Sequence, residues 1–256
     1  MKIIGIIPAR MAATRFPNKP MELIEGMPMI GHCYFRSKMS SLLDDVYVAT
    51  CDQIIYDYIL SIGGKAIMTS EVHERATERS AEALINIEGQ TDQKVDIIVM
   101  IQGDEPLIHP EMINEAIKPL MNGNNQVSNL MSLLNSEEEA RNTNYVKVVS
   151  SLKGNALFMS RELLPSPSKC IRPIDYYRQL GLIAFTRNAI LKFISLPTTS
   201  LEIIESIDMN RFLEHEFPIK MTITNYNADS VDTIEDLNNV IVKMKNDKLY
   251  SKYKIA

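Results

Sequence analysis

The chain has 256 residues, of which 45% are hydrophobic and 23% charged, and its formal net charge is −5 at pH 7. This composition suits one large α/β domain, with or without an insertion, and the negative charge argues against a nucleic-acid partner. No apolar run approaches the roughly 18 residues that span a bilayer, and the N-terminus becomes charged too early for a secretory signal. We therefore predict a cytoplasmic protein with no membrane partner.

Continuous apolar runs of strand length alternate with segments of helical periodicity in the first part of the chain. The runs have the unbroken apolar character of parallel strands buried on both faces, and they are residues 2–8, 46–50, 65–69 and 96–102. The helical segments carry start or stop signals, and they are residues 28–40, 52–64 and 77–88. This alternation predicts βαβ units and a mostly parallel sheet.

The second half has more closely spaced strand-like segments, which indicates antiparallel additions; they are residues 129–134, 145–151, 156–161, 176–187 and 220–227. Residues 162–175 are rich in proline and lack periodicity, so we expect an exposed loop or lid there. Residues 233–253 have the capping and charge pattern of a terminal helix. The predicted fold class is α/β, with a mostly parallel central sheet flanked by helices over residues 1–150 and 216–256. Residues 151–215 are predicted to form a smaller mixed or antiparallel insertion.

A basic loop follows the first predicted strand and carries Arg10, Arg15 and Lys19. Three cations within ten residues repel one another, so a compact loop that holds them is stabilised by an anion placed between them. Ligands of open α/β sheets bind at the carboxyl ends of the strands, and the strand at 96–102 is followed by Asp104. The loop and Asp104 form either a simple salt-bridge cluster or part of a ligand site.

If the loop and Asp104 form a ligand site, we expect its ligand to be a phosphate group that a metal ion links to the carboxylate. Arginine and lysine hold phosphate oxygens, whereas carboxylates hold Mg²⁺, which binds the same phosphates. Asp232 provides a second carboxylate just before the terminal helix, although a residue in that position is also a candidate N-cap.

Several common catalytic motifs are absent from the sequence. No GxGxxG follows the first strand, and no GxxxxGK[ST] or GxSxG occurs, which argues against a Rossmann dehydrogenase, a P-loop kinase and a serine hydrolase. The three cysteines form no CxxC pair and the four histidines are scattered, so neither a disulfide framework nor structural zinc is predicted.

The motifs taken together resemble one enzyme family. The stretches are "IIPARMAATRFPNKP", "VYVAT", "HERATER", "VMIQGDEPLI", "NYVKVV", "ALFMSR", "YYRQLG", "SLEIIE" and "VDTIEDL". Their order is similar to that of the 3-deoxy-manno-octulosonate (Kdo) cytidylyltransferases over nearly the whole chain. The resemblance implies a Rossmann-like nucleotidyltransferase fold and the activation of an acidic sugar with CTP and Mg²⁺. It also implies a homodimer, with the insertion binding the sugar acid and forming the dimer contact.

The resemblance also implies roles for individual residues. Those implied to act in catalysis are Asp104, Asp232, Lys19 and Arg10, with Asp104 and Asp232 as magnesium ligands. Those implied to bind the nucleotide are Ala9, Arg10, Arg15, Lys19, Thr77, Arg79 and Gln102. Those implied to contact the sugar acid are Arg161, Gln179, Glu202 and Glu205.

The sugar region departs from the family pattern. Gln179 replaces a usual histidine, Ile183 and Phe185 replace tyrosines, and Met209 replaces a glutamine. Because a site built to pair hydroxyl groups rejects analogues strongly, the lost polar groups favour a modified Kdo-like acid over Kdo itself. A sialic-type acid, a phosphonate, or a non-catalytic nucleotide-binding homologue are the alternatives.

Two departures lie on the nucleotide side. Asn18 and Ala76 stand where relatives have glycine. Asparagine tolerates a left-handed backbone, whereas alanine would be strained if its position required a positive φ. The nucleobase contacts are therefore less firmly predicted than the phosphate and metal contacts.

Overall fold

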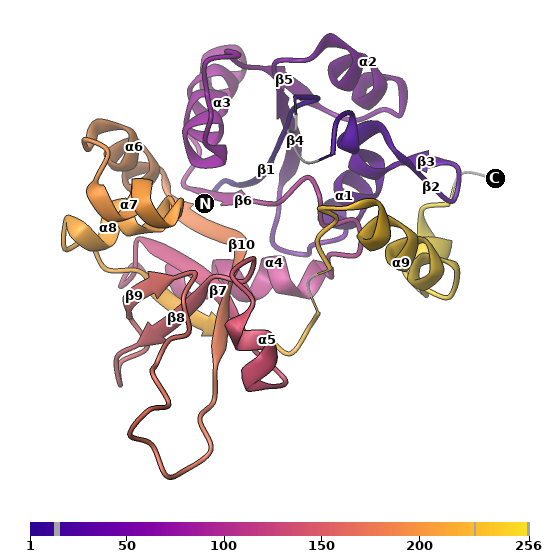
Figure 1. Cartoon of the computed structure of the whole chain (residues 1–256). Helices are drawn as coiled ribbons and strands as arrows, with labels where there is room; N and C mark the ends of the chain where they lie inside the picture. Colours follow the sequence, from indigo (N-terminus) through magenta and orange to yellow (C-terminus); the bar gives the residue numbers. More distant parts are fainter. Residues whose placement is uncertain (13–15, 228, 255–256) are drawn as a thin grey trace. The chain divides into compact units, whose positions relative to one another are not determined.

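The computed structural model describes residues 1–12, 16–227 and 229–254 (Figure 1). The chain divides into two compact units, the first formed by Met1–Asn114 with Asn227–Ala256 and the second by Glu115–Tyr226. The second unit is larger than the predicted insertion at 151–215. It includes strand β7 (Val127–Leu133) because β7 pairs with β10 (Tyr177–Thr186) and with β11 (Lys220–Ile223).

The first unit contains the predicted parallel strands. They are β1 (Ile3–Ala9), β4 (Asp45–Thr50), β5 (Ala66–Met68) and β6 (Ile97–Met100). They lie in the order β6-β1-β4-β5, and every neighbouring pair is parallel. Most residues of β1 and all residues of β6 are buried, which explains their unbroken apolar sequence.

Three helices connect these strands: α1 (Met29–Lys38), α2 (Gln53–Ser61) and α3 (Ala76–Thr91). The steps from β1 to β4 to β5 run one way across the sheet, and the step from β5 to β6 returns past β1. Right-handed crossovers therefore put α1 and α2 on one face and α3 on the other, as Figure 1 shows. The reversal makes the carboxyl ends of β1 and β6 the point where such sheets bind ligands.

The C-terminal segment completes the first unit. Helix α9 (Ile234–Lys245) packs its apolar side chains on the short hairpin of β2 (Leu23–Ile24) and β3 (Met27–Pro28). Val231, just before the helix, is fully buried in the same cluster. Two short 3-10 helices are next to these elements in the chain: η1 (Lys19–Met21) comes just before β2, and η3 (Tyr250–Lys252) follows α9. Val231 and helix α9 are thus held against the first unit by the same apolar cluster.

The second unit is a mixed sheet with short helices. Its other elements are η2 (Lys118–Leu120), α5 (Glu137–Arg141), β8 (Lys147–Ser150), β9 (Ala156–Ser160), α6 (Arg187–Ser195), α7 (Ser200–Glu205) and α8 (Met209–Glu214). The predicted antiparallel pairing holds for β10 with β7 and β8, and for β8 with β9. It is wrong for β11, which pairs parallel to β7. Helix α4 (Pro110–Ile117) spans the boundary between the units.

Three further sequence expectations can be compared with the structure. Residues 162–175 contain no helix or strand. The three cysteines are free thiols, with Cys33 buried and Cys170 exposed. Within the described parts of the chain, no helix has both the length and the apolarity needed to cross a bilayer.

Candidate active site

The site begins where β1 and β6 end beside each other. A Cβ atom on Gly103 would lie 2.9 Å from the backbone oxygen of Pro8, so glycine permits the close approach of the two strand ends. Asp104 follows directly, and its backbone oxygen accepts a hydrogen bond from the amide of Val231 at 2.9 Å. This bond draws the segment that carries Asp232 to the end of β6.

Asp232 is not the N-cap of the terminal helix, so that interpretation is wrong. The cap is Thr233, whose hydroxyl accepts from the amide of Asp236 at 3.1 Å. The Asp236 carboxylate in turn accepts from the amides of Thr233 and Asp232, at 2.9 Å and 3.0 Å. The neighbouring residues cap the helix, which leaves the Asp232 carboxylate available for another role.

Lys19 connects the two aspartates. Its Nζ lies 2.6 Å from Oδ2 of Asp104 and 3.4 Å from Oδ1 of Asp232. It also donates to the backbone oxygen of Val231 at 2.7 Å. The lysine is presented by a tight turn in which Asn18 has a φ of 61°, so the expectation that asparagine tolerates a left-handed backbone there is confirmed.

The donor set of this site fits a hard divalent cation. Asp104 and Asp232 are both partly exposed, and both reach the same positive charge. Mg²⁺ takes oxygen ligands and is usually held by one or two carboxylates, with water and substrate phosphates completing its shell. Among the described residues, no group of three or more acidic, histidine or cysteine side chains is arranged to hold a metal. Two carboxylates beside a basic loop are therefore suited to a metal that arrives with a phosphate.

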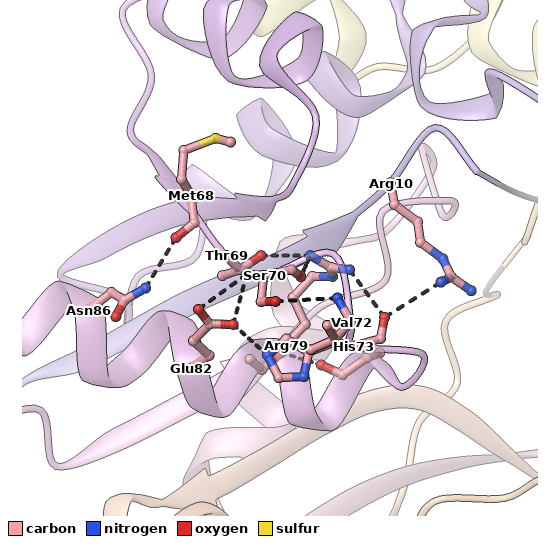
Figure 2. Close-up of polar contacts among 11 residues, drawn as sticks. Arg10, Met68, Thr69, Ser70, Val72, His73, Arg79, Glu82 and Asn86 are labelled. Carbon is pink, nitrogen blue, oxygen red and sulfur yellow. Dashed lines mark hydrogen bonds and ion pairs between the residues drawn. The ribbon is translucent and has the colours of Figure 1, made fainter.

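Figure 2 shows how the segment before α3 is held in place. Arg79 donates to the Thr69 hydroxyl at 2.6 Å and to the backbone oxygens of Ser70 and His73 at 3.1 Å and 3.2 Å. The Glu82 carboxylate accepts from the amide of Ser70 and pairs with the His73 ring. Arg10 comes within 3.5 Å of the same His73 oxygen. The basic loop and the segment at 69–75 are therefore in contact within the first unit.

This geometry bears on the predicted nucleotide ligands. The Arg79 guanidinium is buried and engaged by the protein, so it positions the segment at 69–75, and any direct contact with the nucleobase stays a prediction. Glu82 was not among the predicted residues, because its partners Ser70 and His73 lie outside its helix, nine or more residues earlier in the chain. Ala76 is the first residue of α3 and has no positive φ, which removes the strain considered for it.

The other predicted nucleotide ligands are placed as follows. Ala9 ends β1, and Gln102 is half-buried after β6. Thr77 is fully buried in the first turn of α3, with its hydroxyl 3.8 Å from the Met100 sulfur. Arg15 lies outside the described residues.

Arg36 was not among the predicted residues, but it joins the segment after Asp104 to the C-terminal end of α9. Its buried guanidinium donates to the backbone oxygens of Leu107 and Ile108, each at 3.2 Å, just after Asp104. The same group lies 2.5 Å from the carboxylate of Asp247, just after α9. No local sequence pattern could have revealed a contact between residues so far apart in the chain.

Two of the predicted sugar-acid residues meet in the second unit. The Glu205 carboxylate accepts from the Ser160 hydroxyl at 2.8 Å and from the Arg161 amide at 2.9 Å. The Arg161 guanidinium donates to the backbone oxygen of Glu205 at 2.7 Å. The buried ammonium of Lys147 donates to the backbone oxygen of Arg161, and burial lowers the pKa of this lysine. Gln179 instead donates to the side-chain oxygen of Asn129 at 2.9 Å.

Glu202 is placed differently from these two residues. Both of its carboxylate oxygens accept from the Arg211 guanidinium at 2.7 Å, and both side chains are buried. The pair joins α7 to α8. The structure therefore supports a structural role for Glu202, and its contact with a sugar stays a prediction.

The apolar replacements in the sugar region also have a structural explanation. Ile183, Phe185 and Met209 are all less than 3% exposed. The Phe185 ring packs 6.4 Å from that of Phe212, measured between centroids. Since these side chains form core, packing explains their apolar character, and Kdo becomes a simpler expectation for the acceptor than a modified acid.

Comparisons with known proteins identify the family. Residues 4–223 match the family model described as Cytidylyltransferase. A 3-deoxy-manno-octulosonate cytidylyltransferase of Thermodesulfovibrio yellowstonii is 39% identical over 244 residues, covering 93% of this chain and 96% of the relative. One from Fusobacterium nucleatum is 40% identical over 250 residues, covering 97% and 99%. The chain belongs to the 3-deoxy-manno-octulosonate cytidylyltransferase family.

Solved structures extend the comparison for this cytidylyltransferase. A CMP:2-keto-3-deoxy-manno-octonic acid synthetase complexed with CTP has a TM-score of 0.89 and 30% identity, covering 96% of this chain and 99% of its own. A 4-diphosphocytidyl-2C-methyl-D-erythritol synthase of Anaerococcus prevotii has a TM-score of 0.62 at 13% identity, covering 95% and 98%. The second likeness shows the fold alone. The predicted nucleotidyltransferase fold is confirmed.

Proposed function

We propose that the protein transfers CMP from CTP to the anomeric hydroxyl of a 3-deoxy-2-ulosonic acid and releases pyrophosphate. Curated relatives with the matching name align over nearly the whole chain. The observation that carries the proposal is the meeting of Lys19, Asp104 and Asp232 at the ends of β1 and β6. A cation and two carboxylates at this point suit a metal-bound triphosphate.

Each group has a distinct role in this proposal. Arg10, Arg15 and Lys19 bind the phosphates of CTP, and Asp104 with Asp232 would hold Mg²⁺. When bound, Mg²⁺ offsets the negative charge of the phosphate oxygens and lowers the pKa of a hydroxyl attached to it. The segment at 69–75, held by Arg79 and Glu82, lies within reach of Arg10 and is our candidate for the nucleobase contact.

The reaction is an in-line displacement at phosphorus. The anomeric oxygen forms a bond to the α-phosphorus of CTP, the bond from that phosphorus to the oxygen shared with the β-phosphate breaks, and the hydroxyl proton is released. Lys19 and Arg10 stabilise the charge that develops on the departing pyrophosphate. Positioning and charge stabilisation supply the acceleration, so no dedicated side-chain base is required.

The acceptor side is proposed on weaker grounds. Arg161 is a partly exposed cation suited to the carboxylate of a sugar acid, with Gln179 as a further hydrogen-bonding group. Kdo is the expected acceptor, and a modified Kdo-like acid is the alternative that the sequence departures suggest. A homodimer and a cytoplasmic location complete the proposal.

Pyrophosphate release tests the proposal. CTP, UTP, ATP and GTP are each supplied with Mg²⁺ and, in turn, with Kdo, modified ulosonic acids, sialic acids and phosphonates. We expect release with CTP and an ulosonic acid. The variant Asp104→Asn should lose activity, whereas the control Asp96→Asn, at the opposite end of β6, should keep it.

Three results would overturn parts of the proposal. If pyrophosphate is released from CTP only with a sialic acid or a phosphonate, that compound is the acceptor in place of an ulosonic acid. An active Asp104→Asn variant would show that the Asp104 carboxylate is not a required metal ligand. No release with any pair would favour a non-catalytic nucleotide-binding protein.

A further inference from the structure

Lys19 occupies an unusual electrostatic position. Its ammonium donates to Asp104, to Asp232 and to the backbone oxygen of Val231, so all three of its protons have acceptors within the site. The Lys19 side chain is 13% exposed, less than either carboxylate. The lysine therefore lies between the groups that would hold a divalent cation.

The charges make Lys19 and a divalent cation competitors. With Lys19 in place, the two carboxylates and the ammonium sum to one negative charge. Adding a divalent cation while the ammonium stays would place three positive charges within a few ångströms of one another, against two negative charges. Because Coulomb repulsion is strong at such distances and weakly screened in a partly buried site, the ammonium must move for the metal to bind well.

We propose that Lys19 is an internal counter-ion that holds Asp104 and Asp232 together without metal and leaves them when metal and triphosphate bind. A displaced ammonium needs another anion, and a triphosphate provides one within reach of the same basic loop. Metal and triphosphate therefore bind cooperatively, each improving the site for the other. This inference rests on the proposed function for the metal site at Asp104 and Asp232 and for the identity of the triphosphate as CTP.

The first test uses the wild-type protein and an amine-reactive acylating reagent, followed by peptide mass spectrometry. Lys65 is the internal control because its Nζ lies 2.5 Å from Oδ1 of Asp45, on the opposite edge of the first unit's sheet. We expect the labelling rate of Lys19 to be several-fold lower with Mn²⁺ and CTP together than with Mn²⁺ alone, because the displaced ammonium then pairs with the triphosphate, while the rate at Lys65 is unaffected. At saturating Mn²⁺ alone, the rate at Lys19 should rise. No change at Lys19 with bound Mn²⁺ would overturn the inference.

The second test measures Mn²⁺ binding to the nucleotide-free protein by titration with electron paramagnetic resonance. Lys19→Met should bind Mn²⁺ at least about tenfold more tightly than wild type, because the competing charge is gone. Lys19→Arg, which keeps the charge, should bind as weakly as wild type, and so should the control Lys65→Met. Equal Mn²⁺ affinity in Lys19→Met and wild type would overturn the inference.

A thermal melt separates competition from misfolding. Lys19→Met loses the ammonium that offsets two carboxylates, so its melting temperature should fall without metal and recover with Mn²⁺. Failure of this variant to fold leaves the wild-type labelling result as the decisive measurement. Failure of CMP transfer would reject the proposed function but would leave the Mn²⁺ results intact, so the two ideas fail separately.

Discussion

The buried pair of Glu202 and Arg211 gives the sharpest stability prediction. Both carboxylate oxygens accept from the guanidinium at 2.7 Å, and the two residues are 0% and 3% exposed. The guanidinium also lies 4.1 Å from the centroid of the Phe193 ring, measured from its central carbon. Removal of the carboxylate charge would leave this cation buried without an opposite charge beside it, with neutral acceptors that include the backbone oxygen of Phe193 and the hydroxyl of Thr198, each at 3.4 Å.

We expect Glu202→Gln to lower the free energy of unfolding by about 3 kcal/mol, the low end for breaking a buried pair. The exposed pair of Glu137 and Arg141 is a matched control, because its closest approach is 2.6 Å but both side chains are largely in solvent. There, Glu137→Gln should cost at most about 0.5 kcal/mol. The two pairs have the same charges and similar closest distances, and they differ in burial and in that only one oxygen of Glu137 binds its arginine.

Urea denaturation followed by circular dichroism measures both costs. With a slope of about 3 kcal/mol per molar urea, the midpoint of Glu202→Gln should fall by about 1 M. The double variant Glu202→Leu with Arg211→Met should recover most of the loss, because apolar side chains can replace a buried pair. Equal effects of Glu202→Gln and Glu137→Gln would refute the reasoning, and an unchanged midpoint with a raised KM for the sugar acid would return Glu202 to the binding site.

Three further predictions concern the first unit. The methyl group of Gly103→Ala would meet the backbone oxygen of Pro8 and shift Asp104. This variant should therefore lose about 1–3 kcal/mol of stability and bind Mn²⁺ with CTP more weakly. Unchanged affinity in titration calorimetry would contradict this prediction. Thr233→Ala should cost about 1 kcal/mol in a urea titration through loss of the α9 cap, and no measurable cost would contradict the assigned cap. Burial lowers the pKa of His32 below its ordinary value of 6.5. As the pH falls, this imidazole therefore binds a proton in the unfolded chain before it does so in the folded protein, and the free energy of unfolding should decrease below about pH 6.5. Melts of wild type and His32→Gln from pH 7.5 to 5 check this, and equal pH slopes would refute it.

Much of the fold was predictable because local pattern and tertiary packing agree. The strands β1 and β6 are nearly unbroken apolar runs, and parallel strands buried on both faces require that sequence. The convergence of Lys19 and Asp104 follows from the same logic, since both lie in loops that follow neighbouring strands at the point where the strand order reverses.

Other features depended on contacts that no short segment encodes. The parallel pairing of β11 with β7 joins residues about 90 positions apart, and antiparallel pairing was equally consistent with the segment itself. Glu202 faces Arg211 through the turn between two short helices, so its burial could not be seen in the "SLEIIE" motif. Ile183 and Phe185 sit on a strand with a register shift, and their burial follows from packing in the second unit.

The fate of the α-phosphorus of CTP decides whether the protein transfers CMP to a sugar acid. CTP labelled with ³²P at that position is incubated with the protein, Mg²⁺ and Kdo, and the products are separated. The account predicts that the label appears in a CMP–sugar acid conjugate in step with unlabelled pyrophosphate. Label found in pyrophosphate, or only in free CMP while the sugar acid stays unmodified, would contradict it.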